Sequence, residues 1–538
     1  MLPKRGMLLL TGSYPCAMLK ERIRRLLTHH GTEPEEKREE ASIMRKHRVV
    51  AAAFLSSAFI AAMVGFSAYA DEKAPMQLIT SFTYQMEWSD DAGRYIAESI
   101  CPQIALDEAS AEEYPELARA FDRLNGRKKT EFADNYQTIL EEAKSRYQED
   151  PDYGGSFTDT GSYYVQRADG HVVSVLEVHS GFGGGAHGYK SYTGMNYDPA
   201  SGNEWKLSDF VTDGERFREL VKEKVYSDYP EVEKDLTEEY FNETALDDMI
   251  WLAGCEGITC CFNEYTLGAY AIGDQTVMIP YAGNEKLFTG MSSDVPADCG
   301  TEFPLNHAAV LGGRKVVVSG SLDEYGSYGA VTISVDGEET VFDDDIYTYS
   351  IKPTFLRAHE EEYLYLEYSS DNDYRMFDIY RLGEKPERIG TSDLATACRY
   401  MEEESSTGYL VMTDPENLIL SARTQMLSTA DGQRLYRVGA DGMPEAKEPY
   451  FHIVGERVLT TKQELTCEEA DEEGNRIGTI TIPAGTEMTL LRTDNVSVVD
   501  LSMKDGRIAR VEVSGDQYPN TIDGKKASDI FDGMMFAG

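Results

Sequence analysis

The sequence predicts an α+β N-terminal unit, an antiparallel sheet with helices on one side, followed by all-β modules in a multi-domain chain. A chain of 538 residues is too long for one hydrophobic core, so we expect roughly three or four domains. Helical and strand-like segments occur together only in the first half of the chain. From Gly312 onward, short strands separated by Gly and Asp turns dominate.

The first half of the chain contains the helix and strand signals of the α+β unit, which covers about 75–290. Ser110-Ala-Glu-Glu113 predicts a capping box that opens a helix, and a second apolar stripe ends before Pro151. Two further helices are predicted before residue 250. The predicted strands read "QLITSFTYQMEW", "SYYVQRA", "HVVSVLEVHS", "YKSYTGMNYD", "GITCCFNEYTL" and "QTVMIPY".

The glycine-rich segment "GFGGGAHG" (181–188) joins two of these predicted strands. Its spacing formally fits a dinucleotide fingerprint, but that motif needs a helix directly after the glycines, and here a strand follows. Glycine permits positive φ and close backbone approach. We therefore predict that Gly183, Gly184 and Gly185 form a tight corner in which hydrogen bonds hold His187. Because loops at sheet ends carry binding surfaces, the corner is also a candidate contact surface.

No set of residues in the sequence matches a known catalytic or metal-binding pattern. His171, His179 and His187 recur at intervals of eight without an H-x-x-x-H or H-E-x-x-H motif, which favours structural histidines. The run Asp343–Asp345 is interpreted as a solvated turn or a weak calcium site. The sequence therefore predicts a protein that is not an enzyme and has no cofactor and no metal site.

The N-terminus carries an export signal. A basic segment, Arg45–Arg48, precedes the apolar run Val49–Phe66, and Ala68-Tyr69-Ala70 is a cleavage pattern. Residues 44–70 are thus a signal peptide or, since the run is near the lower length limit for a membrane helix, an uncleaved anchor. Residues 1–43 are then a cytoplasmic tail or an extension from a start codon placed too early.

The net charge limits the classes of partner, and the cysteine count indicates which disulfides are possible. After residue 70 the chain has 40 basic and 88 acidic residues, a net charge of −48. Such a surface repels nucleic acid and anionic lipid and attracts cationic partners. Seven cysteines follow residue 70, an odd number, and Cys255–Cys299 is a candidate disulfide.

The C-terminal half divides into two predicted β regions. Residues 310–448 form a β-rich, blade-like region, in which "HEEEYLYLEYSSDNDYRMFDIYRLGEKPERIG" resembles one propeller blade. Residues 452–538 contain about five short strands with "PAG" and "KDG" turns. This last segment resembles a bacterial SH3-like barrel.

Three segments of the α+β unit together resemble a known family. "GGGAHGYKSYTGMNYDPASGNEWKLSDF" (Gly183–Phe210) and "GITCCFNEYTLGAYAIGDQTVMIPY" (Gly257–Tyr281) are similar to two signatures of the extracellular domain in RsiV-type anti-sigma factors. "CPQIALDEASAEEYPELARAFDRLN" (Cys101–Asn125) resembles the segment that precedes the catalytic domain in PdaC-type peptidoglycan deacetylases. The resemblance covers about 75–285. It implies a PdaC-type N-terminal unit at 75–180 and an RsiV-type domain at 181–290.

RsiV-type proteins cross the membrane once, bind lysozyme outside the cell and hold a sigma factor inside it. The resemblance thus implies an extracellular location and a set of binding residues. These are Gly183, Gly184, Gly185, His187, Tyr189, Asn263, Tyr265, Tyr270 and Tyr281.

The main functional hypothesis is a secreted or cell-wall-associated, non-enzymatic envelope protein. Its expected partner is peptidoglycan or a basic wall-degrading protein such as lysozyme, and it contacts the membrane only if the apolar segment is not cleaved. One alternative is a single-pass membrane anti-sigma factor with an extracellular C-terminus. Another is a wall-glycan deacetylase or an accessory subunit of a hydrolase.

Overall fold

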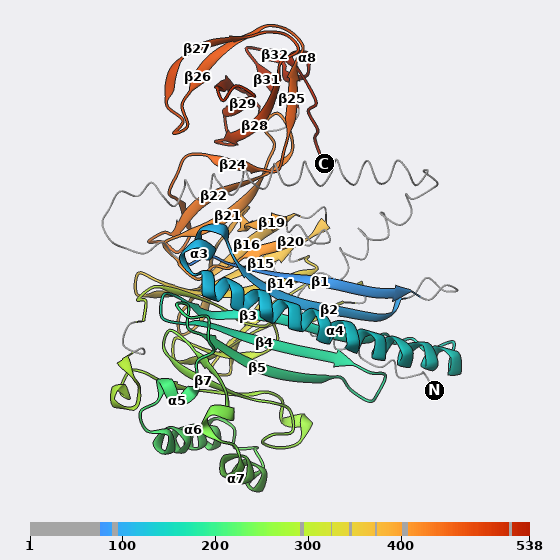
Figure 1. Ribbon diagram of the computed structural model, residues 1–538, viewed down its shortest axis with the longest axis vertical. Helices are drawn as coiled ribbons and strands as arrows, with labels where there is room; N and C mark the ends of the chain where they lie inside the picture. Colours follow the sequence, from blue (N-terminus) through green and yellow to red (C-terminus); the bar gives the residue numbers. More distant parts are fainter. Residues whose placement is uncertain are drawn as a thin grey trace.

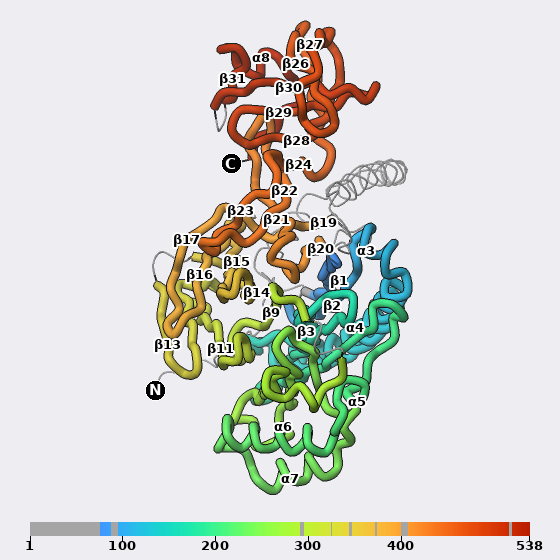
Figure 2. The backbone as a smooth tube through the Cα atoms, turned by 90° about the vertical axis from the view of Figure 1, so that its left-hand side faces the viewer, coloured from blue at the N-terminus to red at the C-terminus, as the bar shows by residue number. Residues whose placement is uncertain are grey.

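The computed structural model describes residues 76–88, 95–290, 295–323, 325–343, 347–371, 374–400, 407–515 and 519–537. It confirms the predicted fold class, because all long helices lie in the N-terminal half and sheets form the rest (Figure 1). The C-terminal strands lie at one end of the long axis and α6 and α7 at the other (Figure 2). The predicted extension (1–43), the predicted signal or anchor (44–70) and two members of the acidic run, Asp344 and Asp345, lie outside these residues.

The N-terminal unit is built on a seven-stranded sheet with the order β19-β20-β1-β2-β3-β4-β5. One neighbouring pair departs from the predicted antiparallel arrangement: β2 and β3 run parallel. A parallel pair needs a long crossover connection, and the helix between these strands supplies it. The strands are β1 (Leu78–Trp88), β2 (Tyr95–Leu106), β3 (Phe157–Ala168), β4 (Val173–Phe182), β5 (Tyr189–Tyr197), β19 (Cys398–Tyr400) and β20 (Thr407–Leu410).

The crossover is one long helix, where the sequence predicts two. The helix α4 (Pro115–Glu149) follows the short α3 (Glu108–Glu113) and contains both predicted apolar stripes. The predicted cap is wrong: Asp107 caps α3 by accepting a hydrogen bond from the Ser110 backbone NH. The Ser110 hydroxyl instead accepts from the backbone NH of Gln77 at 2.9 Å, which fastens the helix start to the sheet.

A second layer covers the face of the sheet opposite α4. Tyr164, Leu176 and Val178 of the large sheet pack against Leu252 and Cys261 of a three-stranded sheet. The outer face of that smaller sheet packs against the apolar side of α6. The elements of this layer are α5 (Leu207–Phe210), α6 (Gly214–Asp228), α7 (Lys234–Glu243), β6 (Ile250–Ala253), β7 (Gly257–Phe262) and β8 (Gln275–Pro280), with 3-10 turns at Leu246–Asp248, Tyr270–Ile272 and Glu285–Leu287.

A buried polar junction joins the two sheets where β5 meets β6. The Asn196 amide donates to the Trp251 carbonyl at 2.9 Å and accepts from the Ala253 NH at 3.0 Å. The Ser174 hydroxyl donates to the same amide oxygen at 2.7 Å. At Gly194 the backbones come so close that a Cβ atom would lie 2.1 Å from the Trp251 carbonyl oxygen. We call Ser174, Gly194 and Asn196 the β5–β6 junction.

The region after residue 295 first forms two packed antiparallel sheets, which share one hydrophobic core. The blade-like segment of the sequence corresponds to consecutive strands of the second sheet. The first sheet holds β10 (Ala308–Leu311), β11 (Arg314–Ser319), β12 (Val331–Val335) and β13 (Glu338–Phe342). The second holds β9 (Cys299–Glu302), β14 (Ser350–Ala358), β15 (Glu361–Ser369), β16 (Arg375–Leu382) and β17 (Pro386–Ser392).

A twelve-stranded sheet then runs through the C-terminal part and crosses residue 450 without a break, because β22 pairs with β24 and β24 with β28. The SH3-like resemblance of the last segment stays a prediction. The strands are β18 (Ala395–Thr396), β21 (Leu418–Thr424), β22 (Ala430–Val438), β23 (Pro444–Ala446), β24 (Phe451–Val454), β25 (Val458–Thr461), β26 (Leu465–Ala470), β27 (Arg476–Ile482), β28 (Glu487–Thr493), β29 (Val498–Met503), β30 (Ile508–Glu512) and β33 (Phe531–Asp532); beside them lie β31 (Thr521–Ile522), β32 (Lys525–Lys526) and α8 (Ala527–Ile530).

Within the described part of the chain, no helix is both long enough and apolar enough to span a bilayer. The apolar run Val49–Phe66 is not among those residues.

Replacing Asn196 with alanine tests the β5–β6 junction. The substitution removes the Asn196 partner of the buried Trp251 carbonyl and Ser174 hydroxyl, while the Ala253 NH keeps only Ser174, so we expect the free energy of unfolding to fall by about 2–4 kcal/mol. Asn203, which is exposed in the turn after β5, is the matched control. N203A should change the unfolding free energy by less than about 0.5 kcal/mol. Urea unfolding that gives equal values for the two variants would contradict the assigned role.

Candidate functional site

The predicted corner is the turn of the β4–β5 hairpin, at one edge of the large sheet (Figure 1). Strand pairing ends at Gly181 opposite Tyr189, so residues 183–188 form the turn, as predicted. Only part of the glycine run is required by the geometry. Gly184 has φ +77°, and a Cβ atom there would lie 2.7 Å from the Phe157 ring. Gly183 and Gly185 have room for a side chain.

The turn and a loop of the second layer bring three aromatic rings together. The His187 imidazole stacks on the Tyr270 ring with centroids 4.2 Å apart and an angle of 20° between the planes. The Tyr265 ring lies 6.0 Å from that of Tyr270, and its hydroxyl is 3.2 Å from His187 Nε2. Tyr265 is 56% and Tyr270 39% exposed. His187, Tyr265 and Tyr270 are called the aromatic cluster below.

Hydrogen bonds hold the His187 ring from both sides. Its Nδ1 lies 2.7 Å from the Gly188 carbonyl oxygen, which can only accept, so Nδ1 donates. The other ring nitrogen, Nε2, lies 3.2 Å from the Tyr265 hydroxyl. Both ring nitrogens are thus engaged, and the prediction that hydrogen bonds hold His187 is confirmed.

The loop that carries the two tyrosines is held against the free edge of β5. The Tyr192 NH donates to the Asn263 side-chain oxygen at 2.6 Å, and the Lys190 NH donates to Glu264 Oε2 at 3.2 Å. At the far end of the loop, the Lys190 ammonium lies 2.5 Å from an Asp274 carboxylate oxygen. These contacts cover an edge strand that would otherwise be open to pairing with another chain.

Tyr265 has φ +65°, which is uncommon for a bulky residue without a glycine's freedom. A conformation of this kind costs on the order of 1–3 kcal/mol and persists only where the surroundings enforce it. Here the flanking Asn263 and Glu264 are both bonded to β5, and the conformation directs the Tyr265 hydroxyl to His187. The contacts of Asn263 and Glu264 thus enforce a strained backbone that places the exposed Tyr265 side chain against His187.

Tyr189 belongs to a second group beside the cluster. Its hydroxyl donates to Asp159 Oδ1 at 2.8 Å, and His179 Nε2 lies 2.5 Å from the same oxygen. Asp159 is buried, whereas Tyr189 is 46% exposed. Burial, and then the Asp159 charge, raise the pKa of the Tyr189 hydroxyl, which keeps it a hydrogen-bond donor at neutral pH. The sequence analysis missed Asp159, because its partners lie 20 and 30 positions away and no motif links them.

The nine residues implied by the family resemblance therefore separate in the structure. His187, Tyr265 and Tyr270 form the cluster, Tyr189 lies beside it, and the three glycines shape the turn. Asn263 braces the loop. Tyr281 lies apart: it is 9% exposed, packs edge-to-face on Phe288 in the core of the second layer and donates to the Gly254 carbonyl oxygen at 3.3 Å.

The cluster lies on an open surface. Two depressions in the described surface, of about 280 and 240 Å³, lie between α6 and β8 and beside α4. Neither is lined by a residue of the aromatic cluster.

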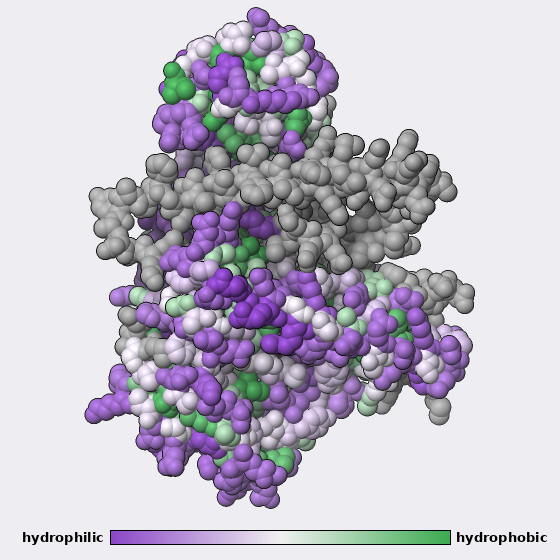
Figure 3. Space-filling view, viewed as in Figure 1, coloured by the Kyte–Doolittle hydropathy of each residue, from purple (hydrophilic) through white to green (hydrophobic). Residues whose placement is uncertain are grey.

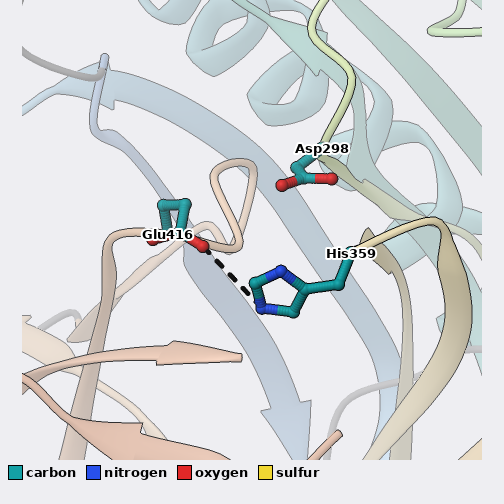
Figure 4. Close-up of side chains that lie close together, drawn as sticks. All are labelled: Asp298, His359 and Glu416. Atoms are coloured by element: carbon teal, nitrogen blue, oxygen red, sulfur yellow. Dashed lines mark ion pairs between the residues drawn. The ribbon is translucent and has the colours of Figure 1, made fainter. Parts of the chain in front are cut away.

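Asp298, His359 and Glu416 are the one group in the described residues with three side chains of metal-ligand type, and their ligand atoms lie within 4.8 Å of one another (Figure 4). Figure 4 shows the three side chains on separate segments around the His359 ring. His359 Nε2 is 4.0 Å from Glu416 but only 2.9 Å from the Val438 carbonyl oxygen, to which it donates. We assign no cation here, because ligands of one ion lie about 3.5 Å apart and this nitrogen is already used.

A family model described as "Protein of unknown function (DUF3298)" matches residues 207–282. This segment is a DUF3298 domain. It contains α5–α7 and β6–β8, and with them Asn263, Tyr265 and Tyr270, while the glycine turn lies before it. No curated protein matches the sequence.

Two solved structures similar to this chain are DUF3298-family proteins. The one from Bacteroides fragilis is 16% identical, with a TM-score of 0.33, and the match covers 41% of this chain and 98% of that protein. The one from Pseudomonas aeruginosa is 14% identical, with a TM-score of 0.29, and the match covers 40% and 96%. The resemblance to RsiV-type and PdaC-type proteins stays a prediction.

The partly buried carboxyl of Glu264 provides a test of how closely the tyrosine loop packs against β5. Partial burial raises the pKa of its carboxyl above the usual 4.5, so the folded protein binds this proton more tightly than the unfolded chain. Stability therefore falls as pH rises through this range. We expect E264Q to be more stable than wild type at pH 7 by roughly 0.5 kcal/mol, a value discounted for solvent exposure, and the difference to disappear below about pH 4.

Glu285 in the loop after β8 is the matched control with the opposite sign. It accepts a hydrogen bond from the Gly283 NH, and this lowers the pKa of its carboxyl. E285Q should therefore not stabilise the protein at pH 7. Urea unfolding at both pH values measures the two effects. A loss of stability in E264Q at pH 7 would contradict the assignment.

Proposed function

We propose that this chain is an exported, non-enzymatic envelope protein that binds a basic wall-degrading enzyme such as lysozyme through the aromatic cluster. The observation that carries the proposal is the cluster itself. Three rings from two chain segments are held in fixed positions on an open surface, although two of them are substantially exposed.

Exposed tyrosines held in this way suit a protein–protein interface. Tyrosine combines apolar area with a polar hydroxyl and is enriched among the residues that contribute most binding energy. Because the rings are already ordered by the β5 contacts, little side-chain entropy is lost when a partner binds. The strained backbone of Tyr265 is consistent with such a role.

Charge favours a basic partner. The chain after residue 70 has a net charge of −48, and Glu264 lies next to the cluster. The face drawn in Figure 3 is mostly hydrophilic, with hydrophobic residues in small separate groups. Opposite charge accelerates encounter with a basic protein such as lysozyme, and this attraction weakens as salt rises. A neutral wall glycan would gain nothing from the charge.

The exposed aromatic surface favours a binding role over a hydrolase or deacetylase at this place. His187 Nδ1 is bonded to the Gly188 carbonyl oxygen and Nε2 to the Tyr265 hydroxyl, so the ring orders the cluster. The lysozyme part of the proposal is supported by the resemblance of Gly183–Phe210 and Gly257–Tyr281 to the extracellular domain of RsiV-type proteins, which bind lysozyme.

Replacing Tyr265 or Tyr270 with alanine tests the binding surface. We expect the affinity for a basic lysozyme to fall by at least about tenfold in Y265A and Y270A, measured by calorimetry or surface plasmon resonance at low and physiological salt. Tyr325, which is 78% exposed and far along the chain, is the matched control. Y325A should bind as wild type does.

The same variants separate the two partner classes. If the wild-type protein binds purified peptidoglycan but not lysozyme, and Y265A loses this binding, the partner is a wall component and not lysozyme. Retention on neither probe at either salt would overturn the proposal.

Sequencing the N-terminus of the protein recovered from cells tests its export. Cleavage after Ala70 gives a chain that begins at Asp71 and excludes the membrane anti-sigma alternative, since no anchor remains. We expect this cleaved form in the extracellular or wall fraction. An uncleaved chain in the membrane fraction would favour the sensor instead.

A further inference from the structure

Cys255 and Cys299 meet where the DUF3298 domain contacts the five-stranded sheet. Cys255 lies in the turn between β6 and β7, and Cys299 begins β9. The Cys255 and Cys299 side chains are hydrogen-bonded to each other. Cys299 is buried and Cys255 is half-buried. Two thiols from separate elements are therefore in direct contact.

Contacts that involve no sulfur hold the same two segments together. Arg357 lies opposite Cys299 in the β14–β9 pairing. Its guanidinium donates to Glu256 Oε1 at 2.9 Å and to the Ala297 carbonyl oxygen at 2.8 Å. Since Glu256 follows Cys255 and Ala297 is two residues before Cys299, one arginine binds both cysteine-bearing segments. The contact between the two sulfurs is thus part of a larger interface between these two segments.

β9 is in turn fixed to the large sheet. The Gln166 amide of β3 donates to the Glu302 carbonyl oxygen at 2.7 Å, and the Thr301 hydroxyl donates to the Gln166 carbonyl oxygen at 3.0 Å. A covalent bond between Cys255 and Cys299 would therefore connect the DUF3298 domain to a strand already anchored on the N-terminal unit.

Two other cysteines, Cys260 and Cys261, lie close to Cys255 in sequence, but they face opposite sides of β7. Cys260 lies in the core between α6 and the small sheet, and Cys261 lies in the core between the two sheets. Adjacent residues of a strand face opposite sides, so these two cannot bond to each other without breaking the strand.

Electrostatics show that the two thiols interact. The hydrogen bond with Cys255 lowers the pKa of the Cys299 thiol, and the Arg357 charge acts in the same direction. The same hydrogen bond, and then burial, raise the pKa of Cys255.

We propose that Cys255 and Cys299 form a disulfide bond that fastens the DUF3298 domain to β9. The oxidant is an external disulfide, such as oxidised glutathione or the disulfide of an exported thiol oxidoreductase. One cysteine thiolate attacks it, forms a mixed disulfide and displaces one external thiolate. The second cysteine loses its proton, and its sulfur displaces the other external thiolate. Two cysteines are oxidised and one external disulfide is reduced to two thiols.

Because Cys299 is buried in the folded protein, the bond forms while the chain folds. A cross-link between positions far apart in sequence restricts the unfolded chain and thereby stabilises the folded one. This inference does not depend on the proposed partner, and its tests need no ligand.

Peptide mapping tests the bond directly. The full-length protein is refolded in a glutathione redox buffer, denatured without reductant, alkylated and digested. We expect a peptide pair joined through Cys255 and Cys299, while the other six cysteines carry the alkyl group: Cys16, Cys101, Cys260, Cys261, Cys398 and Cys467. In C255A the Cys299 peptide should become alkylated. Alkylation of Cys255 and Cys299 in wild type to the same extent as Cys467 would overturn the proposal.

Thermal unfolding with and without dithiothreitol provides a second test that needs no variant. We expect the reductant to lower the wild-type Tm by about 5–10 °C. C255A/C299A should unfold near the Tm of reduced wild type and not respond to the reductant. C467A, which alters a half-buried cysteine elsewhere, should keep the full response. A wild-type Tm that does not change with the reductant would contradict the bond.

Discussion

The candidate site depends on how closely the two sheets approach at the β5–β6 junction. A Cβ atom at position 194 would collide with the Trp251 carbonyl oxygen, so only glycine allows β6 to lie this close. Asn196 and Ser174 then satisfy the backbone groups that the contact buries. This contact sets the position of the loop that follows β7, and so brings Tyr265 and Tyr270 to the turn that carries His187.

The two halves of the aromatic cluster come from segments that are far apart in sequence and are ordered by different means. The β4–β5 turn is shaped by its own glycines, especially Gly184. The tyrosine loop is shaped by side-chain acceptors that occupy the NH groups of the β5 edge. Only the conformation of the β4–β5 turn follows from residues close together in the sequence. The cluster is therefore a property of the packed unit and not of the DUF3298 domain alone.

The sequence predicted the features that depend on local patterns. Alternating apolar residues located β4 and β5, and the glycine run located their turn. Long-range packing decided what the sequence could not show. Asp107 rather than Ser110 caps α3, because the Ser110 hydroxyl is used by Gln77. Tyr265 and Tyr281 occur in the same signature, yet one is exposed and the other lies in a core, a difference set by which face of the small sheet each segment meets.

The central claim is that the β4–β5 turn and the tyrosine loop act as one binding surface. Hydrogen–deuterium exchange of the exported protein, with and without a saturating basic lysozyme, measures this most directly. The account predicts slower exchange in both 183–190 and 263–274, with no change in the C-terminal strands from β25 onward. Protection of only one of the two segments, or of neither while the C-terminal strands are protected, would contradict it.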